Sequence, residues 1–320
     1  MQNLLEDFYG ELDEMYARGD LNAVECFLIK YEETIREEAI QNDSQEQTEL
    51  LLAVYNEMGT FYNAVGRHLK AIEVYEHAGN KAKQTFGEDS SQYASILNNM
   101  AGVYRTQGEL QKAIDLFKEA AAIYGKLGME DAYPYAGVMN NLALCCQEKG
   151  NYPCSIEYLD KALRIYERNP ESKWETALSY NNMTALYSAM GDKDGANFCI
   201  RRALKAFEAC EDEPNVSYCA GMNSLAGFLF TEGEFERAAA VYRKSARYTL
   251  KFFGENLEYA QTCQNIGRTY ERLGRRDEAI SSLERADRIY SRLLGKDHER
   301  TSSVEDDIKR IRRLKTASGM

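Results

Sequence analysis

Large apolar, small and aromatic side chains recur in a fixed order along most of this chain, at a spacing of about 42 residues. In the first complete copy the order is Tyr55, Met58, Gly59 and Tyr62, then, after a turn, Ala71, Tyr75 and Ala78. The i, i+3, i+4, i+7 spacing places the large side chains on one side of a helix, and the small ones allow a second helix to approach closely. The pattern therefore predicts pairs of packed amphipathic helices.

A glycine follows the first helix of each pair. The six glycines are 42, 42, 41, 42 and 41 residues apart, at Gly66, Gly108, Gly150, Gly191, Gly233 and Gly274. Repetition at such a period is typical of a solenoid, in which one unit cannot bury its apolar face alone and packs on its neighbours. We therefore expect an all-α fold built from six stacked helix-turn-helix repeats.

The order of these positions resembles the tetratricopeptide repeat over roughly residues 50 to 290. The period exceeds the usual ~34 residues by about eight, or roughly two helical turns. Such long units, with the pairs Asn98-Asn99 and Asn140-Asn141 and the linker Phe86-Gly87-Glu88-Asp89, resemble kinesin light chain repeats. The resemblance implies a right-handed superhelical solenoid. Repeats three to five depart from the order at four positions that put no fold feature in doubt: Cys146, Ser155, Thr184 and Leu229.

The two ends of the chain differ from the repeats. Residues 1–45 form an imperfect helix pair around Gly19, with fewer apolar positions, and we interpret them as a degenerate capping pair. A terminal unit has one face without a neighbour and must be more polar than the rest. Residues 46–297 then hold the six repeats, residues 298–315 form a C-terminal capping helix, and residues 316–320 form a flexible tail.

Composition narrows the class of protein. The 320 residues are 44% hydrophobic with only 4 Pro, which suits a folded helical chain, and no apolar run approaches the ~18 residues that a membrane span needs. The eight cysteines show no C-x-x-C spacing and mostly fall inside helices, which is typical of a reducing compartment. We therefore expect a cytoplasmic protein.

Charge is placed unevenly. The net charge is -12, and residues 1–57 account for it with 15 acidic and 3 basic side chains. The mildly basic end at residues 268–320 lacks a basic stripe with interleaved aromatic residues, so we expect no nucleic-acid partner. The acidic start and basic end also allow weak head-to-tail association of a protein that we expect to be a monomer.

A side-chain amide recurs in every repeat, on the helix stripe beside the buried one. The six residues are Asn56, Asn98, Asn140, Asn181, Asn223 and Gln264. An amide offers an acceptor and two donors, so a row of amides can pair with the backbone of an extended peptide. The resemblance implies the same, since groove asparagines in similar repeats hold bound peptides in this way. The alternative is that the amides bond helix to helix, as the adjacent Asn99, Asn141, Asn182 and Asn265 do in our interpretation.

Three arginines flank the same stripe and could anchor acidic groups of a peptide: Arg105, Arg268 and Arg272. Phe230 is a candidate apolar contact beside them. The alternative for each arginine is a solvated side chain or a pair with a neighbouring acid, such as Glu271 beside Arg272.

The sequence offers little for catalysis. The histidines His68, His77 and His298 have no serine or cysteine recurring at a matched distance, and Cys146 fills a position that should be buried. We therefore expect no enzyme activity, no metal and no cofactor. The leading hypothesis is a scaffold that binds an extended peptide in the concave groove, and the alternative is a sensor that changes superhelical pitch when it binds a peptide.

Overall fold

The computed structural model describes residues 8–12, 14–16, 21–41, 44–209 and 216–317. Throughout these residues the regular structure is α-helix, without a strand, which confirms the predicted all-α class. No helix in the described ranges is long and apolar enough to cross a membrane. The expected turn at Gly19 lies outside the described residues, as do the last three residues of the expected tail.

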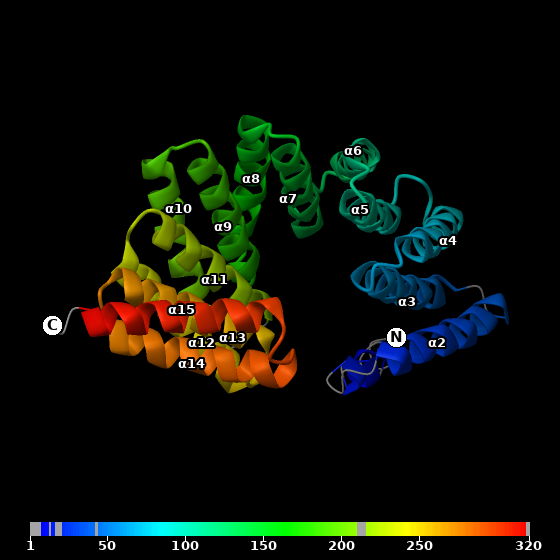
Figure 1. Ribbon diagram of the computed structural model, residues 1–320. Helices are drawn as coiled ribbons and strands as arrows, with labels where there is room; N and C mark the ends of the chain where they lie inside the picture. The colour runs from blue at the N-terminus through cyan, green and yellow to red at the C-terminus, as the bar shows by residue number, and fades with distance from the viewer. Residues whose placement is uncertain (1–7, 13, 17–20, 42–43, 210–215, 318–320) are drawn as a thin grey trace. The chain divides into compact units, whose positions relative to one another are not determined.

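The chain divides into two compact units, Met1–Ile165 and Tyr166–Met320. In the first unit, residues 8–12 and 14–16 are helical and precede a series of longer helices (Figure 1). These are α2 (Leu21–Gln41), α3 (Gln45–Ala64), α4 (His68–Phe86), α5 (Ser91–Thr106), α6 (Leu110–Lys126), α7 (Tyr133–Glu148) and α8 (Tyr152–Tyr166), which ends at the boundary.

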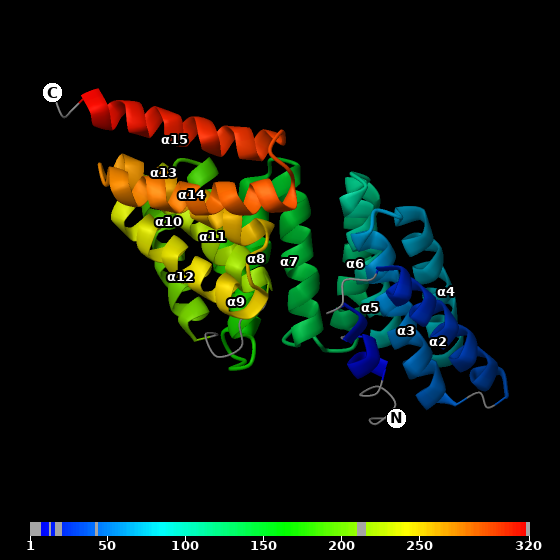
Figure 2. The same cartoon turned by 60° about the horizontal axis from the view of Figure 1, so that its bottom comes forward.

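The second unit continues the alternation of a first and a second helix in each repeat. Its helices are α9 (Lys173–Ala189), α10 (Lys193–Glu208), α11 (Val216–Thr231), α12 (Phe235–Phe253), α13 (Leu257–Arg272), α14 (Arg276–Leu293) and α15 (Glu299–Ala317). Consecutive helices pack against one another, as α12, α13, α14 and α15 do in Figure 2. The helix that we expect over residues 298–315 is α15, which runs two residues further.

The turn inside each repeat explains the six periodic glycines. Each glycine has a positive φ, for example 75° at Gly66 and 74° at Gly274, a conformation that other residues adopt at a cost. The next residue then donates its backbone N–H to a carbonyl five positions earlier, as Arg67 does to Tyr62 over 2.8 Å. This closure satisfies a carbonyl at the helix end and reverses the chain direction.

Small residues lie where the two helices of a repeat cross. At Gly59 an added Cβ would overlap the Tyr75 ring, and at Gly267 it would approach Leu283 Cγ to 2.6 Å. Ala101 has no solvent exposure and takes the same place in the second repeat. The small positions of the pattern therefore set how closely the helices approach.

The departures from the repeat pattern fit into this core. Leu229 is fully buried, Ser155 Oγ donates to the Ala143 carbonyl over 2.7 Å, and Thr184 Oγ1 donates to the Tyr180 carbonyl over 2.9 Å. Cys146 is buried, as expected, and is also joined by a disulfide to Cys154, with the two Cα atoms 5.9 Å apart. The bridge ties α7 to α8 and was not expected from the cysteine spacing.

The described parts of both chain ends bury apolar side chains. Leu12, Val24 and Leu28 are buried in the first pair, and Val304 and Ile311 are fully buried in α15. Arg310 joins α15 to α13 through Glu271, with 2.9 Å between Nη2 and Oε2. The described parts of both terminal segments therefore pack apolar side chains, and the capping role of these segments stays a prediction.

Candidate functional site: the amide face of the first helices

The predicted amides all lie on first helices of the repeats. In the first unit Asn56 lies on α3, Asn98 on α5 and Asn140 on α7, and in the second unit Asn181, Asn223 and Gln264 lie on α9, α11 and α13. The five asparagines are half-buried, whereas Gln264 is only 4% exposed. We call the stripe that carries them the amide face of each unit.

In the first unit the amides form a continuous chain of hydrogen bonds. Asn141 Nδ2 donates to Asn98 Oδ1 over 3.0 Å, and Asn98 Nδ2 donates to Asn99 Oδ1 over 3.0 Å. Asn99 Nδ2 in turn donates to Asn56 Oδ1. Four amides thus connect α7, α5 and α3, and the Oδ1 atoms of Asn56, Asn98 and Asn99 each gain a partner. The adjacent asparagine pairs in the sequence are explained by this chain, because one member of each pair reaches the preceding repeat.

Several amide N–H groups on this face have no acceptor among the described residues. Asn56 Nδ2 and the second N–H of Asn98 donate to no group that the structure describes, and Asn140 makes no side-chain hydrogen bond among those residues. The amide face of the first unit is therefore richer in available donors than in available acceptors.

The amides of the second unit are arranged differently. Asn223 Nδ2 donates to Thr262 Oγ1 over 2.8 Å, and Gln264 Oε1 accepts a long bond of 3.4 Å from Gln261 Nε2. The Oδ1 atoms of Asn181 and Asn223 are buried and lack a hydrogen-bond partner within the described part of the chain. Threonine and glutamine here replace part of the asparagine chain.

Two of the three candidate arginines pair with acids on the next first helix. Arg105 Nη1 lies 2.6 Å from Glu148 Oε1. Arg268 Nε lies 2.9 Å from Asp307 Oδ2, a carboxylate that also accepts from Arg310 over 2.8 Å. Bonds to Glu271 and Asp307 raise the pKa of Arg310 above its ordinary value. A peptide carboxylate would have to compete with these partners, so Arg105 and Arg268 join repeats to one another.

Arg272 has a different environment. Its guanidinium lies 4.6 Å from the ring centre of Phe235 and 5.8 Å from that of Phe230, and the two rings meet edge to face. Among the described residues it has no carboxylate within 4 Å. The predicted apolar contact Phe230 therefore lies beside the one candidate arginine that keeps its donors available.

A shared spacing underlies these contacts and could have been found in the sequence. In the first unit, four polar contacts join residues 43 positions apart: Asn56 with Asn99, Asn63 with Thr106, Asn98 with Asn141, and Arg105 with Glu148. The offset is one residue longer than the repeat. A search for complementary polar residues at this offset would have paired the asparagines with each other and the arginine with its glutamate.

The described residues offer little for chemistry. They contain no group of three His, Cys, Asp or Glu side chains that could hold a metal ion. Burial raises the pKa of the Cys145 and Cys263 thiols to about 11, so both are protonated at neutral pH. A protonated, buried thiol is a poor nucleophile and a poor metal ligand.

Comparison with known proteins agrees with this architecture. The family model described as "Tetratricopeptide repeat" matches residues 50–126, 135–209 and 218–292. The curated protein "Tetratricopeptide repeat protein 23" of Mus musculus is 22% identical over 152 residues, which are 47% of this chain and 31% of the mouse protein. The chain therefore spans about a third of that relative's length.

Two solved structures with TM-scores above 0.5 share the fold at low identity. A Signal Transduction ATPase with Numerous Domains protein with a tetratricopeptide repeat sensor, from Pyrococcus horikoshii, has a TM-score of 0.66 at 15% identity, covering 96% of this chain and 46% of that one. BtubC (BKLC) from P. vanneervenii has a TM-score of 0.55 at 19% identity, covering 86% and 93%. Repeats of a putative kinesin light chain from Podosopora anserina match at 17% identity with a TM-score of 0.39, covering 76% and 96%.

Proposed function

Because the chain belongs to the tetratricopeptide repeat family, whose stacked repeats present extended binding surfaces, we propose that it is a non-catalytic scaffold for an extended segment of a partner protein. The observation that carries the proposal is the row of available amide donors on α3, α5 and α7. An extended backbone presents carbonyl groups that accept from such donors whatever its side chains are.

The geometry of the repeats sets the length of that segment. Neighbouring helices pack about 8–10 Å apart, and an extended chain advances about 3.3 Å per residue. One amide therefore meets about every third residue of the segment. A segment of about seven residues would reach Asn56, Asn98 and Asn140.

An acidic residue in the partner is a further element of the proposal. Arg272 is the candidate because its neighbours are the aromatic rings of Phe230 and Phe235 rather than carboxylates. The rings hold the guanidinium plane and leave its edge for a bidentate bond to a carboxylate.

The test uses a random heptapeptide display library, selected on the full chain, and compares two alanine variants with the peptides obtained. Asn140→Ala removes an amide without a partner among the described residues, so we expect about fivefold weaker binding, equivalent to ~1 kcal/mol, and an unchanged Tm. Asn99→Ala is the matched control, because it cuts the bond to Asn56 and should lower the Tm while peptide affinity is retained. Equal affinity in wild type and Asn140→Ala would refute the groove proposal.

The alternative is a sensor in which the peptide changes the arrangement of the chain. Because each repeat packs mainly on its neighbours, small changes at successive repeat junctions would add up along the array. Small-angle scattering with and without a selected heptapeptide distinguishes the two. A smaller radius of gyration in the complex supports the sensor, and an unchanged one supports the passive scaffold.

The remaining elements of the proposal concern setting and partners. We place the protein in the cytoplasm as a monomer that needs no cofactor and binds neither nucleic acid nor membrane. The net charge of -12 supports the exclusion of nucleic acid, since phosphate backbones repel an acidic chain.

A further inference from the structure

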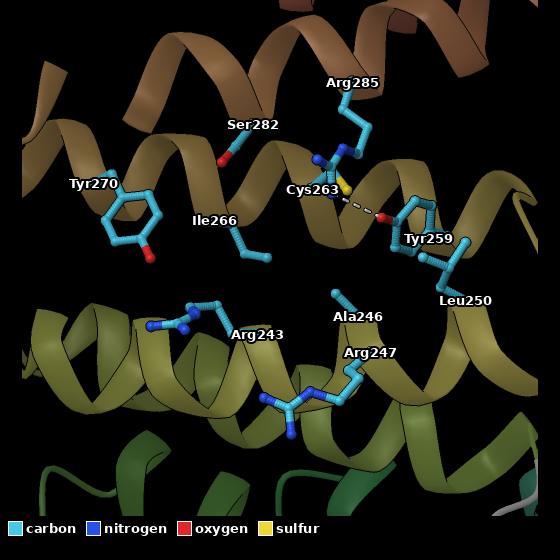
Figure 3. Close-up of a pocket in the computed structure, with 10 residues that line it drawn as sticks. All are labelled: Arg243, Ala246, Arg247, Leu250, Tyr259, Cys263, Ile266, Tyr270, Ser282 and Arg285. Carbon is cyan, nitrogen blue, oxygen red and sulfur yellow. Dashed lines mark hydrogen bonds between the residues drawn. The ribbon is translucent and has the colours of Figure 1, made fainter. Parts of the chain in front are cut away.

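A crevice of about 380 Å³ opens in the second unit between α12, α13 and α14. Its floor is the buried side of α13, where Tyr259, Cys263 and Ile266 are each at most 6% exposed. Arginines stand along its rim: Arg243 and Arg247 on α12 and Arg285 on α14 (Figure 3). We call it the basic crevice.

The basic crevice is separate from the amide face. Tyr259, Cys263 and Ile266 are spaced by four and three residues and share one side of α13. Gln264 and Arg268 lie on the neighbouring stripe, about 100° around the helix. A ligand in the crevice would therefore contact a surface that the proposed peptide does not use.

The two arginines on α12 are one helical turn apart and are not neutralised locally. In the described part of the chain, neither Arg243 nor Arg247 has a carboxylate oxygen within 4 Å. Glu278 and Arg243 interact from further away, and Arg275 already binds Glu278 over 2.5 Å. Like charges at i, i+4 repel each other, so an anion between them would be stabilising.

The third arginine is held in place by the floor. Arg285 Nη1 donates to the Tyr259 hydroxyl over 3.1 Å, a bond drawn in Figure 3. The nearby carboxylate of Glu255 is in an ion pair with Arg292 at 3.0 Å. Burial raises the pKa of Cys263, so the floor contributes a neutral thiol and no opposing charge.

The first unit holds a matched crevice, which shows that the fold does not require these arginines. It lies between α4 and α5, has a volume of about 270 Å³ and is lined by Tyr75, Tyr93 and Leu97 among others. We call it the mixed crevice, because acidic, amide and basic side chains line it: Glu76, Asn80 and Lys83.

Its rim has a different charge at the same repeat positions. Ten and fourteen residues after the turn glycine it carries Glu76 and Asn80 in place of Arg243 and Arg247. Glu119, which accepts from the Tyr93 hydroxyl, corresponds to Arg285, and Lys83 lines the mixed crevice where the basic crevice has Leu250. The repeat thus fixes a crevice here, and the three arginines belong to the second unit.

We propose that the basic crevice binds an organic phosphate. The phosphate dianion would lie among the three guanidinium groups, which donate in pairs to its oxygens. The apolar body of the ester would cover Leu250 and Ile266. The volume is in the range of small-molecule sites, which combine an apolar lining with a few polar groups that fix orientation.

The first experiment titrates phenyl phosphate into the full chain by isothermal titration calorimetry, with a Kd on the order of 0.1–1 mM expected from its size. The double variant Arg243→Glu, Arg247→Asn installs the residues of the mixed crevice and should weaken binding at least tenfold. Both positions are exposed, so its Tm should equal that of wild type. Neutral benzyl alcohol should bind at least tenfold more weakly than phenyl phosphate.

A control with the same change in charge makes the result specific. Arg201→Glu, Lys205→Asn alters the corresponding positions one repeat earlier, on α10, and should leave phenyl phosphate affinity unchanged. Equal loss in both double variants, or equal binding by wild type and the crevice variant, would overturn the proposal. Inorganic phosphate binding as tightly as phenyl phosphate would also overturn it, because the apolar floor would then contribute nothing.

A phosphate ester with an apolar body can be a free metabolite or a phosphorylated tyrosine in a protein. A phosphotyrosine heptapeptide distinguishes them in the same assay. Affinity at least tenfold above that of phenyl phosphate indicates a protein source, and equal affinity indicates a free ligand. The Asn140→Ala variant should bind phenyl phosphate as wild type does, so failure of this proposal and failure of the groove proposal are separately visible.

Discussion

The mixed and basic crevices are built from the same repeat positions and differ in the charge of their rims. Both have a tyrosine fifteen residues before a turn glycine, Tyr93 in one and Tyr259 in the other. The Tyr93 hydroxyl donates to Glu119 over 3.5 Å, whereas the Tyr259 hydroxyl accepts from Arg285 over 3.1 Å. The buried positions thus set the shape of the crevice, while the exposed positions around it set which ligand charge it favours.

The energetic reason is the difference in burial. Tyr259 is 2% exposed and packs between three helices, so most substitutions there disturb the core. Arg243 and Arg247 are exposed, and substitutions at such positions usually change stability by less than about 0.5 kcal/mol. A repeat array can therefore change one crevice without altering its fold.

The strongest challenge to the comparison is to convert the mixed crevice into a basic one. The triple variant Glu76→Arg, Asn80→Arg, Glu119→Arg should gain a second phenyl phosphate site, because three guanidinium groups then surround the same kind of floor. We expect about 100-fold tighter binding at that site and a calorimetric stoichiometry of two instead of one. Glu73→Arg, on α4 but outside the crevice, is the control and should leave the stoichiometry at one.

The next effect concerns helix crossing in the first and last repeats. In Gly267→Ala the new Cβ would lie 2.6 Å from Leu283 Cγ and 3.1 Å from the Ala279 carbonyl oxygen, and a backbone atom cannot move aside cheaply. In Gly59→Ala the obstacle is the ring of Tyr75, which is a side chain. Alanine has a higher helix propensity than glycine, which offsets part of the cost of the clash. We therefore expect the free energy of unfolding in urea to fall by about 2 kcal/mol for Gly267→Ala and by about 1 kcal/mol for Gly59→Ala. The reverse order would contradict this interpretation.

A smaller effect is expected on the free energy of unfolding at alkaline pH. Burial raises the pKa of Cys263 to about 11, so between about pH 9 and 11 the folded state keeps a proton that the unfolded state releases. The unfolding free energy must then fall as pH rises, by about 1 kcal/mol at pH 10 for this one group. Cys145 in the first unit has the same raised pKa, so Cys263→Ala and Cys145→Ala should each reduce the slope of stability against pH by a similar amount. An unchanged slope in either variant would show that its thiol does not titrate in this way.

The smallest expected effect comes from the two tyrosine hydroxyls. Tyr259→Phe removes the acceptor of Arg285, and Tyr93→Phe removes a longer bond to Glu119. Arg285 is exposed, so water replaces much of what it loses, and we expect about 0.5 kcal/mol for Tyr259→Phe and less for Tyr93→Phe by thermal unfolding. Tyr259→Phe should also weaken phenyl phosphate binding about twofold, since Arg285 loses its orientation.

Sequence alone predicted the helix pairs and the turns because both depend on local rules. The glycines at the turns need positive φ, and their spacing gave the repeat directly. The substitutions at Thr184 and Ser155 did not disturb the fold, because each hydroxyl finds a backbone carbonyl within its own repeat. Local hydrogen bonding of this kind is invisible in the hydrophobic pattern but compatible with it.

The partners of the candidate site residues were harder to predict because they come from other repeats. The sequence indicated that Asn99 and Asn141 bond helix to helix, but it did not identify their partners, which are the side-chain oxygens of Asn56 and Asn98. It also gave Arg105 no partner, since Glu148 is 43 residues away. The basic crevice was not predicted for the same reason. Its arginines lie on α12 and α14, and α13 separates these two helices in the sequence.

The offset of 43 residues that four contacts of the first unit share has an evolutionary consequence. Each of these four contacts pairs a residue with one that belongs to the following copy of the same unit, so gene duplication of one whole unit of 42 residues copies the donor and the acceptor together. The new copy meets complementary groups on both neighbours at once. Arrays of this design can therefore lengthen or shorten by whole units without any compensating substitution, whereas an insertion of a single residue would break the match at that junction.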